Sequence, residues 1–185
     1  NFKLINGCFS RIDEIIVSKS KKTQFDFIIF DLGLSSNQLG DSKRGFSFMN
    51  EGPLDMNMGE AKLNASDIIN NFSEKKLKDI LSEFGDEKFA FKIAKRIVKS
   101  RKVKIINTTL ELSKIINESV PLSYSRKLKI NPATKTFQAL RIYVNDELNE
   151  LKTALKKCVK LLNINGRILV VSFHSLEDKI VKDFF

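Results

Sequence analysis

Hydrophobic residues form one dense run early in the sequence, at Phe25–Phe30. The run contains only Phe and Ile apart from Asp26, and it lacks the alternation of a strand with one face in water. This pattern is typical of a strand that is buried on both faces of a parallel sheet. Asp31 follows at once, which places a carboxylate at the carboxyl end of the strand, where open α/β sheets bind their ligands.

Further strands and helices are predicted on either side of this strand. Asn1–Cys8 has the composition of a short strand, and a helix is expected at about Asp13–Ser18. Later in the chain, Asn165-Gly166 predicts a turn into an apolar strand at Arg167–Phe173, and a helical pattern resumes from Leu176. Strands that alternate with helices predict a parallel sheet.

A long polar segment with several glycines follows the first strand. It contains more large apolar side chains than a solvated loop usually carries. We therefore expect it to fold back over a pocket, although methionines more commonly fill gaps in a core. The side chains concerned are Phe46, Phe48, Met49, Met56 and Met58.

Amphipathic helices are predicted between about Gly59 and Ile130. Ser73 can cap a helix that ends at Gly85, and Thr108 with Glu111 forms a T-x-x-E capping box for another. After Asn131-Pro132 one long helix is predicted, because apolar residues recur at spacings of three, four or seven as far as Leu162. The pattern as a whole predicts a doubly wound sheet with a helical insert.

Composition adds a basic character to this picture. The 185 residues carry a formal net charge of +10, with a pI of about 9.6, which suits a polyanionic partner. A lysine-rich surface that maintains solubility explains the charge equally well. No apolar run of about 18 residues occurs, so no membrane span is expected. Cys8 and Cys158 are predicted to be reduced core thiols of a cytoplasmic protein, and a single histidine argues against a metal site.

Basic residues are concentrated between Lys88 and Lys104, where eight Lys or Arg occur without an acid. Most charged helix faces are merely solvated, but such faces usually mix both signs. An unmixed face predicts contacts with RNA phosphates. No exposed aromatic residue is expected within it, so we expect it to follow phosphates without stacking on bases. The residues that share this helix face are Lys88, Lys92, Lys95, Lys99 and Lys102.

Several other polar residues are candidates for the chemistry of a site. Two interpretations of Asp31 are open: the carboxylate contacts a ligand, or it only caps the turn at Gly33. Asp55 accepts a hydrogen bond from a substrate amine or orders its own loop. Ser172 and His174 follow the second strand, and they line a substrate pocket or cap the helix that comes next.

Three blocks of sequence resemble a known family. They read FDLGLSSNQLGDSKRGFSFMNEGPLDMNM at Phe30–Met58, NPATKTFQALRIYVNDELNEL at Asn131–Leu151 and GRILVVSFHSLEDKIVKDFF at Gly166–Phe185. The blocks, and the order of the weaker stretches between them, are similar to the RsmH (MraW) family. Its members are S-adenosylmethionine-dependent cytosine-N4 methyltransferases of small-subunit ribosomal RNA. The likeness covers nearly the whole chain.

The resemblance implies a fold, an activity and binding residues. The fold is α/β: a class I (Rossmann-like) methyltransferase sheet at 1–58 and 131–185, incomplete here, with a small helical insert at 59–130 that recognises RNA. The implied activity is methyl transfer from S-adenosylmethionine to the exocyclic N4 of a cytidine in 16S ribosomal RNA, at the decoding centre and in the cytoplasm. The implied partner is this RNA or the ribosomal subunit. The family positions that bind S-adenosylmethionine fall on Phe9, Asp31 and Gln38.

The sequence departs from the family pattern in two ways. The family opens with a strand and a glycine-rich loop that hold the methionine end of the cofactor, and neither precedes Asn1; the family also continues beyond Phe185. We therefore expect an internal fragment that is inactive by itself. In addition, Asn37 stands where the family has a proline, which predicts a less rigid turn at Ser35–Gln38.

Two other functions fit parts of the pattern. A non-catalytic RNA-binding or ribosome-assembly module would need no glycine-rich loop. A DNA cytosine-N4 methyltransferase would carry an (Asp/Asn/Ser)-Pro-Pro-aromatic tetrapeptide after the strand, whereas Asp31-Leu32-Gly33-Leu34 contains no proline. The resemblance favours the RNA methyltransferase.

Overall fold

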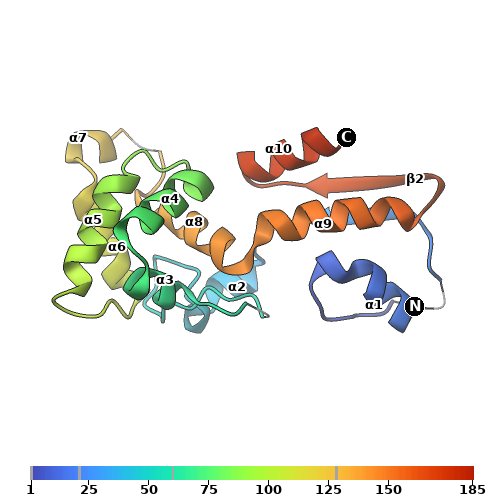
Figure 1. Ribbon diagram of the computed structural model, residues 1–185, viewed down its shortest axis with the longest axis horizontal. Helices are drawn as coiled ribbons and strands as arrows, with labels where there is room; N and C mark the ends of the chain where they lie inside the picture. The colour runs from blue at the N-terminus through green and yellow to red at the C-terminus, as the bar shows by residue number, and fades with distance from the viewer. Residues whose placement is uncertain (1, 21, 60, 128) are drawn as a thin grey trace. The chain divides into compact units, whose positions relative to one another are not determined.

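The computed structural model describes residues 2–20, 22–59, 61–127 and 129–185. The chain forms two compact units: unit 1 is Asn1–Gly33 with Asp146–Phe185, and unit 2 is Leu34–Asn145. Figure 1 shows strand β2 in unit 1 and helices α2 to α8 in unit 2. The units divide the chain at residues other than the predicted 58 and 131, because the segment after residue 33 and helix α8 (Ala133–Asn145) both contribute to the core of unit 2.

Unit 1 contains a two-stranded parallel sheet, formed by β1 (Phe25–Asp31) and β2 (Leu162–Val171). At its carboxyl edge Asp31 lies opposite Val171. Parallel neighbours require a long crossover connection, and here the crossover contains all of unit 2 and helix α9 (Glu147–Lys160). The protein is therefore a mixed helix and strand protein with a small parallel sheet.

Strand β2 differs from its predicted limits at both ends. It begins before the expected turn at Asn165-Gly166 and stops two residues short of Phe173. Between Phe25 and Phe27 the register shifts, so residues 163–166 bulge out of the ladder. Asn165 permits this bulge because it adopts the left-handed conformation, with φ of 66°.

The helices of unit 1 cover only one face of the sheet. Side chains of α1 (Ile12–Lys19), α9 and α10 (Ser175–Phe184) pack with Phe30 and Ile28 of β1. The intervening residues Phe27 and Ile29 are 51% and 58% exposed, so the prediction of burial on both faces is wrong for the described chain. The buried members of this core are Phe30, Leu32, Leu151, Ala154, Leu155 and Cys158.

The beginning of unit 1 also differs from the prediction. Residues 2–8 form no strand, and Cys8 is half-buried, so it is not the core residue expected. Cys158 is buried as expected, and burial raises the pKa of its thiol to about 11, which keeps it protonated at neutral pH. The predicted helix is confirmed as α1, and Lys157 of α9 lies 2.7 Å from the Asp13 carboxylate.

Unit 2 is helical, and its predicted caps are confirmed. The Ser73 hydroxyl accepts the Lys76 N–H, and Thr108 and Glu111 form both bonds of their capping box. Among the described residues, no helix of either unit is long and apolar enough to cross a membrane. The helices of unit 2 other than α8 are α2 (Ser36–Gly40), α3 (Ala65–Asn71), α4 (Glu74–Gly85), α5 (Ala90–Arg101), α6 (Thr109–Ser119) and α7 (Leu122–Ser125), with a 3-10 turn at Ser42–Arg44.

The single long helix predicted after Asn131 is two helices, α8 and α9. Asp146 separates them because its backbone is left-handed, with φ of 49°. The Asn145 amide donates to the Arg141 carbonyl at 2.8 Å and to the Met56 carbonyl at 2.8 Å, and its Oδ1 accepts the Met58 N–H at 2.8 Å. A short amide side chain thus ends α8 and binds the loop at Met56.

The loop before α3 fills the core of unit 2 instead of covering a pocket. Phe46, Leu54 and Met56 are buried in that core, and Met56 is fully inaccessible although its φ is 58°. Only Met49 of the predicted apolar set is largely exposed, at 71%. The commoner use of methionine, filling a gap in the core, is therefore the one observed at Met56.

We predict that Gly45→Ala destabilises unit 2 by at least about 2 kcal/mol, because a side chain there combines a left-handed backbone with overpacking. Gly45 has φ of 68°, and an added Cβ would lie 1.9 Å from the Pro53 carbonyl oxygen. Gly40→Ala is the matched control, since nothing lies within 4 Å of its Cβ position. Chemical denaturation of both variants measures the difference; equal unfolding free energies would contradict the prediction.

Candidate functional site

Asp31 occupies the carboxyl edge of the parallel sheet, as the sequence predicts. Its carboxylate is exposed, and no described residue forms a hydrogen bond or ion pair with it. Capping of the Gly33 turn would require such a bond, and the described residues provide none. Gly33 has φ of 88°, and a Cβ at this position would lie 3.3 Å from the Phe173 ring. The carboxyl edge of the sheet therefore carries the Asp31 carboxylate, which has no partner among the described residues, and the exposed ring of Phe173 lies close to Gly33.

Phe9 lies close to the same end of strand β1. It begins the 3-10 turn Phe9–Arg11 (η1), and its ring packs edge-on against Phe30 at 6.0 Å, leaving 38% of the residue exposed. Glu150 of α9 fixes this turn, because its carboxylate accepts the Ser10 hydroxyl at 2.9 Å and the Ser10 N–H at 3.2 Å. Phe9 thus contacts the residue that precedes Asp31 in β1, although the Phe30 and Asp31 side chains point to opposite faces of the strand.

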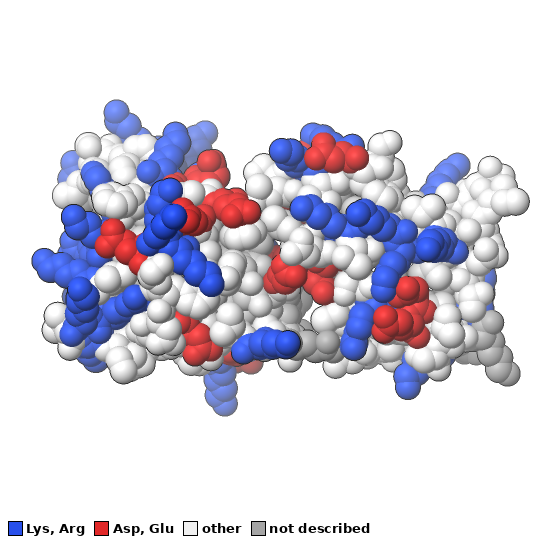
Figure 2. All heavy atoms as spheres, in the orientation of Figure 1, with Lys and Arg blue, Asp and Glu red and all other residues white. Residues whose placement is uncertain are grey.

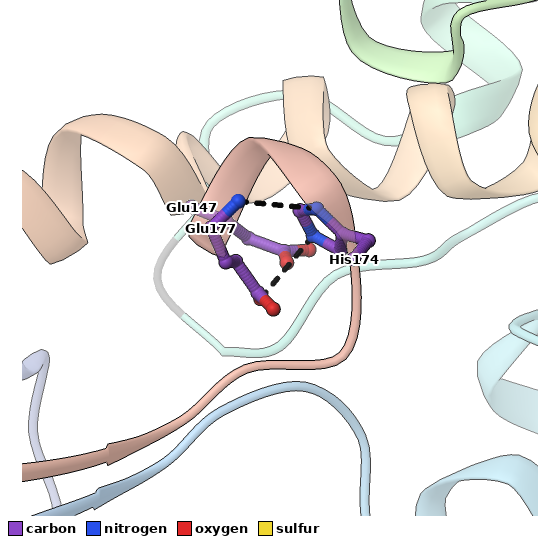
Figure 3. Close-up of side chains that lie close together, drawn as sticks. All are labelled: Glu147, His174 and Glu177. Carbon is purple, nitrogen blue, oxygen red and sulfur yellow. Dashed lines mark hydrogen bonds and ion pairs between the residues drawn. The ribbon is translucent and has the colours of Figure 1, made fainter. Parts of the chain in front are cut away.

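His174 caps helix α10, which is one of the two interpretations left open by the sequence. Its Nδ1 accepts the Glu177 N–H at 3.4 Å, and Glu177 in turn accepts the Phe173 N–H at 2.8 Å. Glu147, at the start of α9, directs its carboxylate to the same imidazole (Figure 3). The convergence of Glu147 with His174 and Glu177 was not predicted, because the two helices are far apart in the sequence. Ser172, just before, is half-buried and makes no hydrogen bond with a described residue.

The donor atoms of Glu147, His174 and Glu177 lie within 4.8 Å of one another, the spacing of a possible metal site. The cap determines the imidazole tautomer, however: since Nδ1 accepts a hydrogen bond, the neutral ring carries its proton on Nε2. That Nε2 is 3.2 Å from the Glu177 carboxylate. Metal binding through Nε2 would need the opposite tautomer and would break the cap, so the arrangement suits a carboxylate-supported helix cap.

Gln38 belongs to unit 2, where it has a structural partner. Its side-chain carbonyl accepts the Ser35 N–H at 2.9 Å, and the Ser35 hydroxyl accepts the Gln38 N–H at 3.2 Å. This capping box holds the first turn of α2 although Asn37 replaces the proline of the family pattern. The contact of Gln38 with a cofactor stays a prediction.

Asp55 also belongs to unit 2 and orders its loop through backbone atoms. Its carbonyl accepts the Ala65 N–H at 2.9 Å, and the Leu54 carbonyl accepts the Ser66 N–H at 2.7 Å, so the loop satisfies donors at the start of α3. The Asp55 carboxylate is half-buried and forms no hydrogen bond with a described residue. It therefore remains available to accept one from a substrate.

Helix α5 carries Lys92, Lys95 and Lys99 of the predicted basic face, whereas Lys88 precedes the helix and Lys102 is its C-cap. Figure 2 shows Lys and Arg side chains gathered over the part of unit 2 where Figure 1 places α5. All five predicted lysines are exposed, and none forms an ion pair with a described residue. We call them the lysine face: Lys88, Lys92, Lys95, Lys99 and Lys102.

The other basic residues of this segment have structural partners. Arg96 pairs with Glu118, and Lys104 lies 2.6 Å from Glu111 and lowers the pKa of that carboxyl through their hydrogen bond. Arg101 donates to the Ile69 carbonyl, and burial lowers the pKa of its guanidinium. Arg96, Arg101 and Lys104 thus differ from the lysine face, because their charged groups interact with other parts of the protein.

One residue of α5 contradicts the expectation that this surface lacks exposed aromatics. Phe91 is 56% exposed, and the Lys95 ammonium lies 5.9 Å from its ring centre. The apolar face of the helix is elsewhere, since Ile93 and Ile97 are fully buried. The helical spacing contained this signal, because Phe91 falls outside the arc of buried positions.

Glu87 fixes the start of α5. Its carboxylate accepts the Phe89 N–H at 2.9 Å, and the residue is 9% exposed. Burial raises the pKa of this carboxyl, against the opposing effects of the Phe89 hydrogen bond and the Lys135 charge. Ionisation of Glu87 therefore lowers the free energy of unfolding at neutral pH.

The fold and these sites define a class: an α/β protein with polar groups at the carboxyl edge of parallel strands and a helical unit that presents a basic surface. Comparison with known sequences gives the family. A profile of the MraW methylase family matches residues 1–185, so the chain belongs to this family.

Curated relatives agree with this assignment. The chain is 50% identical over 186 aligned residues to ribosomal RNA small subunit methyltransferase H of Caldicellulosiruptor saccharolyticus, an alignment that covers 100% of this chain and 59% of that protein. It is 52% identical over 168 residues to the proteins of the same name from Rickettsia canadensis and Rickettsia massiliae, covering 91% of this chain and 54% of each relative. The chain thus spans between half and two thirds of the relatives it matches.

We predict that Glu87→Gln raises the melting temperature at neutral pH. Glutamine keeps an oxygen for the Phe89 N–H but cannot ionise. The raised pKa means that the folded protein favours protonated Glu87, so the gain should shrink as the pH falls towards and below the ordinary value of 4.5. Glu83→Gln, at an exposed position of α4, is the control. Equal effects of the two changes across the pH range would contradict the prediction.

Proposed function

We propose that the protein to which these residues belong transfers a methyl group from S-adenosylmethionine to the exocyclic N4 of a cytidine in small-subunit ribosomal RNA. The observation that carries the proposal is the 50% identity, over the whole chain, to a relative named ribosomal RNA small subunit methyltransferase H. The family match over residues 1–185 supports it. A ribosomal RNA substrate would place the activity in the cytoplasm.

The proposal assigns a role to each unit. The parallel strands of unit 1 would form part of a class I (Rossmann-like) sheet, whose carboxyl edge binds the cofactor. The helices between residues 59 and 130 would bind RNA, which the unpaired lysine face supports. These residues lie within unit 2.

Two residues of unit 1 fit the proposed cofactor. The Asp31 carboxylate is exposed and without a partner among the described residues, and it can favour a positively charged ligand or accept hydrogen bonds from it. Phe9 offers a partly exposed ring on which adenine can stack. When bound, S-adenosylmethionine supplies an activated methyl group on a sulfonium centre.

The acceptor amine needs help from the protein, because its lone pair delocalises into the cytosine ring. Side chains can hold the amine in line and accept hydrogen bonds from its protons. Asp55 and Ser172 have side-chain oxygens that accept no hydrogen bond from a described residue, so each is a candidate for this role. His174 is a weaker candidate, because its Nδ1 is occupied by the cap of α10. The base itself must be unpaired to reach such a site.

We predict that Asp31→Ala in the full-length protein weakens S-adenosylmethionine binding and lowers methylation of ribosomal RNA, with little change in the melting temperature of the cofactor-free protein. The reason is that the carboxylate stabilises no described part of the fold. Calorimetric titration and thermal denaturation measure the two effects separately.

The control for this experiment is Asp26→Ala, at the opposite end of the same strand. Asp26 accepts a hydrogen bond from the Asn163 amide at 2.6 Å and pairs with Lys22, so its loss should lower stability and leave binding intact. If Asp31→Ala instead lowered stability by about 1 kcal/mol with unchanged binding, Asp31 would be a turn cap and not a cofactor contact.

We predict that replacing Lys92, Lys95 and Lys99 together with alanine weakens RNA binding similarly for cognate and scrambled RNA. Interactions with phosphates supply affinity without sequence information. The slope of log affinity against log salt concentration should flatten by roughly 0.7 to 0.9 for each lysine–phosphate interaction that the substitutions remove. S-adenosylmethionine affinity should not change.

A triple variant of equal charge controls for the reduction in net charge. Lys152, Lys156 and Lys160 are exposed on α9 of unit 1 and follow a similar helical spacing. Their replacement with alanine should flatten the salt slope less than the α5 variant does. Identical salt slopes for the two variants would contradict the prediction and would show that the lysine face is an ordinary solvated surface.

A further inference from the structure

Phe91 is unusual among the residues of helix α5. The other apolar side chains that define the helix face, Ala90, Ile93, Ala94 and Ile97, are between 0% and 3% exposed, whereas Phe91 is 56% exposed. Its burial would require packing that no described element provides. Single exposed apolar residues are common, so the surroundings of Phe91 decide what its exposure means.

The surroundings of Phe91 are cationic. Lys95 follows it by four residues in α5, so the two side chains are neighbours on the helix surface, and Lys88 lies in the turn just before the helix. The Lys95 ammonium lies 5.9 Å from the ring centre, within the range of a cation–π contact. The whole segment from residue 88 to residue 104 contains no acid. An aromatic ring thus stands within a positively charged surface whose lysines have no ion-pair partner among the described residues.

This combination has a specific use in nucleic-acid binding. Lysines that follow a duplex backbone need no aromatic neighbour, because the bases of a duplex are stacked on one another and their faces are closed. Proteins that bind single strands combine a positively charged track with aromatic rings on which successive bases stack. A protein partner would instead have to place acidic groups against the lysines and apolar groups against Phe91. The density of unpaired positive charge favours a polyanion.

We propose that Phe91 and the flanking lysines form a binding site for unpaired RNA, in which one base stacks on the Phe91 ring while Lys88, Lys95 and Lys99 contact the adjoining phosphates. This inference rests on the proposed RNA-binding role of the helices and adds that the bound strand is single-stranded at α5. At least one base of the bound strand is therefore unpaired at α5 in the complex.

The absence of tryptophan from the sequence gives a direct test. Phe91→Trp in the full-length protein adds one indole at the site, and the difference in emission from the unaltered full-length protein reports the surroundings of that indole. A short single-stranded RNA should quench its fluorescence, whereas an RNA duplex of the same length should quench it much less. Leu122→Trp is the matched control, because Leu122 is 72% exposed in α7 of the same unit and lies outside the lysine face. Its fluorescence should respond weakly to both RNAs.

Affinity measurements give a second, independent readout. Phe91→Ala should weaken binding of the single strand by about 5- to 150-fold, the range expected for removal of one stacked base, and Phe91→Tyr should restore most of the affinity. Duplex affinity and the salt slope should both be retained, because the lysines are intact.

Three results would overturn the inference. They are an equal weakening of single-stranded and duplex RNA binding in Phe91→Ala, no quenching of Phe91→Trp by the single strand, or a blue-shifted emission of Phe91→Trp before RNA is added, which would show a ring covered by protein. If the unaltered protein bound no RNA at all, the proposed function would fail instead. If it bound RNA with a lysine-dependent salt slope but without a Phe91 effect, only the stacking site would fail.

Discussion

The parallel pairing of β1 with β2 is the constraint on which the candidate site depends. Parallel strands end at the same edge of a sheet, so the residues after each strand meet there although most of the chain separates them. Asp31 and Ser172 owe their common location to this register, and Phe9 reaches the same end of β1 through its contact with Phe30. The same pairing requires a crossover, and the chain uses that crossover to carry an entire second unit.

Local chemistry made much of this fold predictable. The capping residues Ser73, Thr108 and Glu111 lie where the structure shows caps, since a cap depends on neighbours within one turn. The limits of the strands and the break at Asp146 were missed for the opposite reason. Apolar spacing continues through that break, and what ends α8 is the Asn145 side chain, whose partner at Met56 is distant in the sequence. The burial of β1 on both faces was predicted from its apolar side chains. Such side chains favour burial, but the sequence does not show which elements cover each face of the strand.

The candidate site shows the same division. The place of Asp31 at a strand end could be predicted from the sequence, whereas its lack of a partner among the described residues is visible only in three dimensions; its contact with a ligand stays a prediction. The spacing of the lysines predicted a common face, but it could not show that Arg96 and Arg101 are engaged elsewhere, since Glu118 and the Ile69 carbonyl belong to other helices. The exposure of Phe91 follows from helical spacing alone, because the residue lies outside the arc of Ala90, Ile93, Ala94 and Ile97, which are buried.

The interruption of unit 1 by unit 2 also bears on how the chain folds. Residues 34–145 are contiguous, so unit 2 can assemble from contacts within one stretch of chain, whereas β1 must find β2 across that whole stretch. Closing a disordered loop of this length carries an entropic cost. Once unit 2 has folded, the connection between the strands is already largely ordered. The packing of the unit 2 core has then offset much of the loss of chain entropy that strand pairing would otherwise require. Prior folding of the basic helical unit would then make it easier for β1 to pair with β2, and so to form the edge that carries Asp31.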